Sequence, residues 1–136
     1  KLDAPKLLKI LVFNYLFSNG DAHFKNFSIL ETPFGDYRLS PAYDLLNSRI
    51  HIEDKEFALD DGLLPRNLAQ GKIGLQFAKL AEKAEISEKT FQDIMLLMIS
   101  KSDLVEKMVA ASFLNDTTKR NYFQSFQGRL KQLTNV

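Results

Sequence analysis

The sequence predicts a mainly α-helical domain: a buried central helix, then a polar loop and a β-hairpin, then a helical bundle. Three observations favour this fold class. An apolar run near the start of the chain contains no helix breaker. Two short strand-like runs flank a turn that contains Pro33 and Gly35. From Leu64 onward, apolar residues recur at helical spacing and no strand signal follows.

Composition limits the protein classes that need to be considered. The 136 residues are 45% hydrophobic and 26% charged, which is typical of one globular domain covering residues 1–136. Lys and Arg total 18 against 17 Asp and Glu, so no strong field favours direct binding to nucleic acid or to an anionic membrane. The absence of cysteine excludes disulfides and thiol chemistry and fits a reducing cytoplasm.

The length of the first apolar run and the start of the chain bear on localisation and completeness. The longest apolar run, Ile10 to Phe17, is interrupted by Asn14 and is too short to span a bilayer. No signal-peptide pattern is present, so we expect a cytoplasmic protein. The chain opens with Lys1, Leu2 and Asp3 and has no initiating methionine. This opening leads us to expect that the chain was cut from a longer protein.

A first helix is expected over residues 4–18. Asp3 is placed to act as an N-cap, and Pro5 suits the first turn. The segment Ser18, Asn19 and Gly20 is expected to end the helix. Because the run is apolar on nearly every side from Ile10 onward, the helix should lie in the middle of the domain.

A hairpin follows this helix. Residues 27–31 and 37–39 are rich in aromatic and aliphatic side chains and should form its strands. Residues 49–61 are expected to be extended or irregular. Beyond them, Ser87 and Ser102 are candidate N-caps, and Asn115 or Asp116 should begin the last helix.

The loop between the first helix and the hairpin has the residues of a catalytic site. Asp21 and Asn26 stand at the D-x-x-x-x-N spacing of kinase catalytic loops. In such loops the Asp accepts the proton of the substrate hydroxyl and the Asn binds Mg²⁺. Lys25 could neutralise the charge of the γ-phosphate, and His23 could donate to the same oxygens or hold the loop.

Asp44 is the expected second metal ligand. If the hairpin turn centres on Gly35, Asn26 and Asp44 lie at equal distances from it along the chain and should face each other. Facing residues of an antiparallel pair have Cα atoms only about 4.5 to 5.5 Å apart, which is close enough to share one ion. Hard oxygen ligands of this kind suit Mg²⁺.

The same residues have simpler interpretations. The segment from Asn19 to Asp21 is also an ordinary helix stop and turn. Asn26 could be a residue at a strand edge, and Tyr43 with Asp44 could cap a short helical turn. Spacing by itself leaves both interpretations open.

Two segments resemble the C-terminal domain of the HipA-like toxin kinases. They are residues 20–28, GDAHFKNFS, and residues 37–46, YRLSPAYDLL. Their order and spacing are similar to the family's catalytic loop and metal-binding segment. The resemblance implies a kinase-like C-terminal lobe that uses ATP and Mg²⁺, with Asp21 as the catalytic base and Asn26 and Asp44 as the magnesium ligands.

The resemblance also implies a function and partners. HipA-like kinases act in bacterial toxin–antitoxin pairs, where they phosphorylate a serine or threonine hydroxyl of a protein substrate, an aminoacyl-tRNA synthetase, and are held by a DNA-binding antitoxin. Only one helix precedes Asp21, without a glycine-rich loop or a strand carrying an ATP-binding lysine. The N-terminal lobe that holds ATP would therefore act in cis or in trans. Two alternatives remain, a non-catalytic pseudokinase or binding module of the same fold and a metal-dependent hydrolase.

Overall fold

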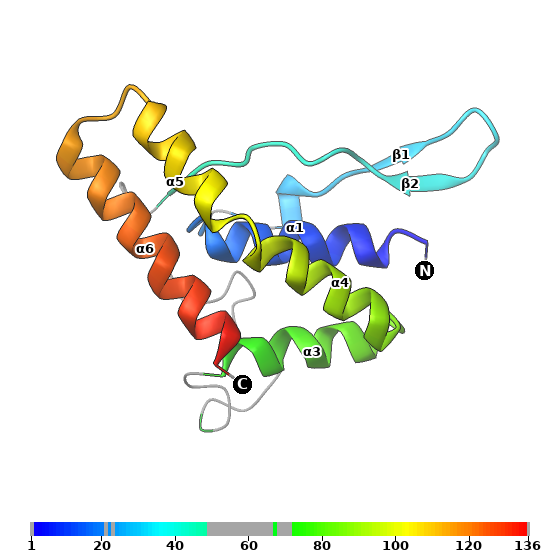
Figure 1. Ribbon diagram of the computed structural model, residues 1–136. Helices are drawn as coiled ribbons and strands as arrows, with labels where there is room; N and C mark the ends of the chain where they lie inside the picture. The colour runs from blue at the N-terminus through cyan, green and yellow to red at the C-terminus, as the bar shows by residue number, and fades with distance from the viewer. Residues whose placement is uncertain (1, 21, 23, 49–66, 68–71, 136) are drawn as a thin grey trace.

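The computed structural model describes residues 2–20, 22, 24–48, 67 and 72–135. The fold is mainly helical, as the sequence predicts, and the polar segment 49–61 lies outside the described residues. Figure 1 shows the order of the elements along the chain. They are α1 (Ala4–Leu16), the 3-10 turn η1 (Phe24–Asn26), β1 (Ile29–Glu31), β2 (Tyr37–Leu39), α3 (Ile73–Lys83), α4 (Glu88–Ile99), α5 (Ser102–Ala111) and α6 (Asp116–Thr134).

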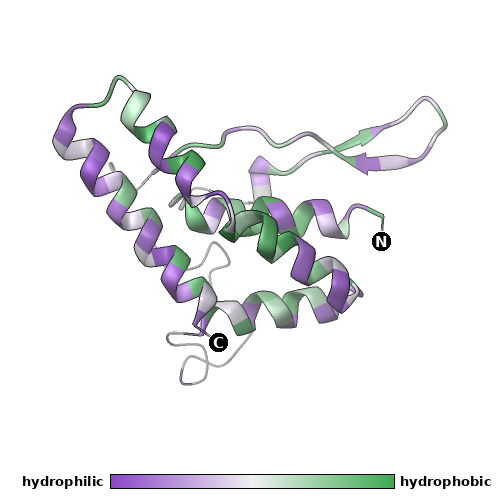
Figure 2. Cartoon of the chain, in the orientation of Figure 1, coloured by the Kyte–Doolittle hydropathy of each residue, from purple (hydrophilic) through white to green (hydrophobic). Residues whose placement is uncertain are grey.

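Helix α1 is the centre of the hydrophobic core. It contacts α3, α4 and α6, which places it inside the helical layer that these elements form. In Figure 2, green hydrophobic residues mark α1 and α4 where the two helices pass each other. The prediction of a buried central helix is confirmed. The buried apolar side chains of the core are those of Leu8, Leu11, Val12, Tyr15, Leu16, Ile73, Phe77, Ala81, Ile94, Val105, Phe126 and Leu133.

Helix α1 ends at Leu16, earlier than expected, and Ser18, the first residue of the predicted stop segment, makes the turn. The Ser18 amide donates to the Tyr15 carbonyl at 3.2 Å, and the Asn19 amide donates to the Asn14 carbonyl at 2.9 Å. These two bonds form a Schellman motif, which requires a left-handed residue between them. Ser18 takes that conformation, with φ of 56°. A serine there is less favoured than glycine, so other contacts must stabilise this turn.

Asp3 occupies the N-cap position of α1, as predicted, but its side chain makes no capping hydrogen bond. Its carboxylate instead accepts hydrogen bonds from the Arg38 guanidinium and, at 2.8 Å, from the Leu39 amide. Lys6 donates from Nζ to the Leu39 carbonyl at 2.7 Å. A strand at the edge of a two-stranded sheet leaves backbone groups for other partners. The start of α1 bonds to those of Leu39 and therefore anchors β2.

The hairpin is centred on Phe34 and not on Gly35, which corrects the expected register. Ile29 pairs with Leu39, and Glu31 pairs with Tyr37. The turn is closed by bonds from the Gly35 amide to the Thr32 carbonyl and from the Thr32 amide to the Asp36 carbonyl. Gly35 occupies the last, left-handed position of this turn, with φ of 79°. Continued along the chain, this register pairs residue 26 with residue 42.

The helix starts agree with the sequence at two of three positions. Ser87 accepts a hydrogen bond from the Thr90 amide and caps α4, and Asn115 accepts one from the Thr118 amide and caps α6. Ser102 is wrong as a cap, because it is the first residue of α5 and Lys101 precedes it at the cap position. Within the described part of the chain, no helix combines the length and apolar character that crossing a membrane requires.

The anchor between α1 and β2 should titrate at low pH. The hydrogen bond from Arg38, followed by that from the Leu39 amide, lowers the pKa of Asp3 from 3.8 to about 2. Because the folded state has the lower pKa, the anchor stabilises the fold fully above pH 3.8 and is lost as the pH falls through about 2. Carbon-detected NMR titration of the Asp3 carboxyl group checks this, and Arg38→Gln should return its pKa toward the ordinary value. An Asp3 carboxyl that titrates near 3.8 in the unchanged chain would contradict the anchor.

Candidate functional site

The candidate site lies where the loop after α1 meets the segment that follows β2. The structure describes Lys25, Asn26 and Asp44, whereas Asp21 and His23 lie outside the described residues. The two segments contact each other at three places. Each contact places a residue of the predicted catalytic loop beside the segment that contains the predicted metal ligand.

The first contact is made by Ser48, which is buried. Its Oγ accepts a hydrogen bond from the Gly20 amide at 2.7 Å and lies 3.2 Å from the Ser18 carbonyl, to which it donates. The Ser48 amide donates to the same carbonyl at 3.0 Å. Ser48 therefore bonds to the residues on both sides of Asn19. One of them, Gly20, immediately precedes the predicted base. These bonds also stabilise the left-handed turn at Ser18.

The second contact joins Asn19 to Asp44. Asn19 Nδ2 donates to the Asp44 carbonyl at 3.1 Å and to Asn14 Oδ1 at 3.2 Å. Asp44 is exposed and has a left-handed backbone, with φ of 54°. Non-glycine residues seldom adopt this conformation, and they persist in it where surrounding contacts hold them. The bond from Asn19 fixes the main chain of Asp44 and leaves its carboxylate toward solvent.

The third contact is made by Tyr43, which precedes Asp44. Its hydroxyl donates to the Lys25 carbonyl at 3.2 Å and lies 2.7 Å from Ser28 Oγ. Lys25 and Asn26 belong to the η1 turn, so this bond ties η1 to the segment after β2. The neighbours of Asn26 and Asp44 are thus hydrogen-bonded to each other. This contact supports their proximity by a route other than the hairpin register that the sequence suggested.

The donor chemistry of Asn26 and Asp44 fits Mg²⁺. Asn26 is half-buried and lines a cavity of about 10 Å³ together with Asn14, Asn19 and Tyr43. An amide oxygen and a carboxylate are the hard ligands that magnesium prefers, and water or phosphate oxygens complete its octahedron in other proteins. Among the described residues, no three His, Cys, Asp or Glu side chains group together. A site of this kind would therefore depend on Asn26, Asp44 and ligands from bound nucleotide.

A larger apolar cavity borders the same segment. It has a volume of about 380 Å³ and extends from the C-terminal half of α1 to α5, with Asn19 and Tyr122 among its polar lining residues. Burial raises the pKa of the Tyr122 hydroxyl. The apolar lining residues are Phe13, Phe17, Leu45, Leu46, Val105, Met108, Val109 and Leu114.

Sequence reasoning missed the residues that hold the site together. The sequence pattern predicts Asn19 as part of a helix stop and Tyr43 as a candidate cap. Ser48 carried no signal, because a lone serine after an irregular run can serve many purposes. Only the fold brings Ser48 beside Gly20, since 28 positions separate them along the chain.

The fold and the site together define a class of protein. The chain is a mainly helical domain whose central helix leads into a polar loop, and a segment beyond a short hairpin is hydrogen-bonded against that loop. Residues 1–110 match the family model of the HipA-like C-terminal domain. The chain belongs to this family, and the resemblance expected from the sequence is confirmed.

Two curated relatives come from Sinorhizobium fredii. A protein named "Putative kinase Y4dM" is 40% identical over 92 residues, which cover 67% of this chain and 22% of the relative. A second, named "Putative kinase Y4mE", is 48% identical over 46 residues, which cover 34% of this chain and 11% of the relative. The chain thus spans less than a quarter of the length of these relatives.

Removing the Ser48 hydroxyl tests whether the two segments hold each other. Ser48→Ala leaves the Gly20 amide without its acceptor, and we expect a loss of about 1–3 kcal/mol in the free energy of unfolding. Urea denaturation followed by circular dichroism measures this loss. Ser100→Ala is the matched control, because Ser100 is exposed and bonds only within its own helix end, to the Leu97 carbonyl. The control should change stability by less than about 0.5 kcal/mol. Equal stability of the two variants would show that Ser48 does not hold the segments.

Proposed function

We propose that this chain is the catalytic lobe of a HipA-like kinase that transfers the γ-phosphoryl group of ATP to a serine or threonine hydroxyl of a protein. The observation that carries the proposal is the set of hydrogen bonds between residues 18–26 and residues 43–48. These bonds hold the predicted catalytic loop against the segment that contains Asp44. Phosphoryl transfer depends mostly on positioning and on charge stabilisation, so such a scaffold suits it.

In the proposed reaction, the substrate hydroxyl oxygen attacks the γ-phosphorus. The bond between the γ-phosphorus and the β,γ-bridging oxygen breaks, which releases ADP. The Asp21 carboxylate accepts the hydroxyl proton. Asn26 and Asp44 would hold Mg²⁺, which when bound neutralises charge on the phosphate oxygens. Lys25 is exposed in η1, and we assign its ammonium group to neutralising charge on the transferred phosphate. We assign His23 either to the same oxygens or to the shape of the loop.

The exposed surface of the hairpin is a candidate contact site for a second lobe. Ile29, Leu30 and Tyr37 are exposed although they are strand residues, and Phe34 at its tip is 94% exposed. Figure 1 shows the hairpin extending beyond the helices, and among the described residues β1 and β2 form a two-stranded sheet. A two-stranded hairpin with an exposed apolar surface is marginally stable in water and commonly packs against a partner. We propose that the N-terminal lobe that holds ATP, in cis or in trans, packs there.

The remaining partners follow from the family alone. From the HipA-like toxin kinases we propose an aminoacyl-tRNA synthetase as the protein substrate, a DNA-binding antitoxin as the partner and a bacterial cytoplasm as the compartment. A protein substrate fits the exposed position of Lys25 and Asp44, because a large substrate must reach the site from solvent.

Substitution of the two aspartates should separate chemistry from binding in a complete enzyme that contains this lobe. Asp21→Asn keeps the size of the side chain but removes the proton acceptor, so kcat should fall by about 10²- to 10⁴-fold while Mg·ATP still binds. Asp44→Ala removes a metal ligand, so Mg·ATP affinity and rate should fall together. Single-turnover phosphorylation and calorimetric Mg·ATP titration measure the two effects.

Asp93→Asn is the matched control, because Asp93 is an exposed carboxylate on α4. It should leave both rate and affinity unchanged. Phosphate transfer at the unchanged rate by Asp21→Asn would exclude the proposed mechanism. Such a result would favour a non-catalytic role for the loop.

A further inference from the structure

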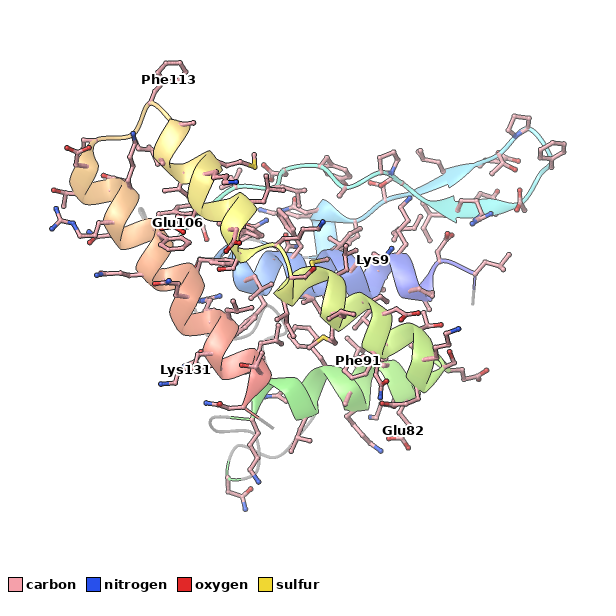
Figure 3. The ribbon with its side chains drawn as sticks, in the orientation of Figure 1. Lys9, Glu82, Phe91, Glu106, Phe113 and Lys131 are labelled. Atoms are coloured by element: carbon pink, nitrogen blue, oxygen red, sulfur yellow. The ribbon has the colours of Figure 1, made fainter. Side chains whose placement is uncertain are left out.

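Helix α6 places a buried arginine against the last turn of α1. Arg129 is only 7% exposed, which is unusual for a charged side chain. Its Nη1 donates to the Tyr15 carbonyl at 2.7 Å, and its guanidinium carbon lies 5.0 Å from the centroid of the Tyr15 ring. Figure 3 shows Lys131, two residues further along α6, pointing away from the domain. The inner face of α6 thus has a cation where a core side chain would be expected.

The carbonyl that Arg129 binds also belongs to the turn that starts the catalytic loop. Tyr15 accepts one hydrogen bond from Arg129 and a second, at 3.2 Å, from the Ser18 amide. A carbonyl oxygen has two lone pairs, so both bonds can form at once. The Ser18 amide bond is part of the Schellman motif that requires the left-handed conformation. Arg129 therefore fixes the acceptor on which this turn depends.

Two further residues on the same face of α6 contact the same place. The Tyr15 hydroxyl donates to Gln132 Oε1 at 2.8 Å, and Ser125 Oγ lies 3.3 Å from Ser18 Oγ. Ser125, Arg129 and Gln132 follow helical spacing, which puts them on one side of α6. In Figure 1, α6 passes the C-terminal end of α1. One polar stripe of α6 therefore contacts both Tyr15 and Ser18.

We propose that α6 positions the catalytic loop and that Arg129 is its main positioning residue. Helix α6 begins at Asp116, beyond the residues 1–110 that match the family model, so the family match does not assign this role. From Ser18 the restraint passes through Ser48 to Gly20, the residue before Asp21. The effect on phosphate transfer rests on the proposed function, whereas the restraint on the loop does not.

Amide hydrogen exchange of this chain tests the restraint directly. In Arg129→Ala, exchange at Ser18, Asn19 and Gly20 should accelerate by about tenfold or more, since a hydrogen bond from a charged donor is lost. This acceleration should exceed that at Phe77 in the core of α3, which reports global unfolding. Arg129→Lys keeps the charge but lacks the planar guanidinium, so it should restore part of the protection.

Arg120→Ala is the matched control, because Arg120 is an exposed arginine on the same helix. It should leave exchange in the loop unchanged. If Arg129→Ala does not fold, Ser125→Ala decides the matter, because it removes the contact to Ser18 Oγ, keeps Arg129, and should still speed exchange at residues 18–20 by severalfold. Loop exchange that stays unchanged in the folded variants, or that rises no more than exchange at Phe77, would overturn the proposal.

Kinetic measurements on the complete enzyme distinguish positioning of the catalytic loop from a purely structural role of Arg129. Arg129→Ala should lower kcat by about tenfold and leave Mg·ATP affinity within about twofold, because Tyr43 and Asn19 still hold the metal-ligand segment. Arg129→Lys should recover part of kcat. A complete wild-type enzyme that transfers no phosphate would refute the proposed function, while the exchange measurements would still decide whether α6 positions the loop.

Discussion

The hydrogen bonds of Ser48 are the constraint on which the candidate site depends. A single buried hydroxyl holds the Gly20 amide and the Ser18 carbonyl, so two segments far apart in the chain become one unit. Without it, the left-handed Ser18 would lack much of its support, and Asp44 would be tied to the loop through Asn19 and Tyr43 alone. Buried polar networks of this kind specify one arrangement, because each unsatisfied group would cost free energy.

Much of the fold could be predicted from the sequence because helical periodicity and capping are local. The central helix, the hairpin and the starts of α4 and α6 all follow from neighbouring residues. The departures from the prediction depend on partners that lie far away in the sequence. Asp3 keeps the N-cap position but its carboxylate bonds to Arg38 and the Leu39 amide. The left-handed Ser18 is stabilised by Ser48 and Ser125.

The candidate site shows the same limit. The spacing of Asp21 and Asn26 points to kinase chemistry, and a hairpin symmetry about Gly35 predicts Asp44 as the second ligand. The observed register is centred on Phe34 instead. The proximity of the two segments comes instead from Tyr43, Asn19 and Ser48, whose roles appear only in the folded chain. The buried cation of α6 is equally invisible in sequence, where Arg129 stands among ordinary helix-surface residues. Long-range hydrogen bonds leave no periodic trace.

We propose that Asn26 and Asp44 bind one divalent ion. Mn²⁺ can replace Mg²⁺ and broadens NMR signals near its binding site, so titration of this chain with Mn²⁺ tests this proposal. The Asn26 side-chain amide and the Asp44 backbone amide should broaden together, before the exposed Asp93, and Asp44→Ala should abolish the broadening at Asn26. Broadening at Asn26 that persists in Asp44→Ala, or that never accompanies broadening at Asp44, would contradict a shared metal site.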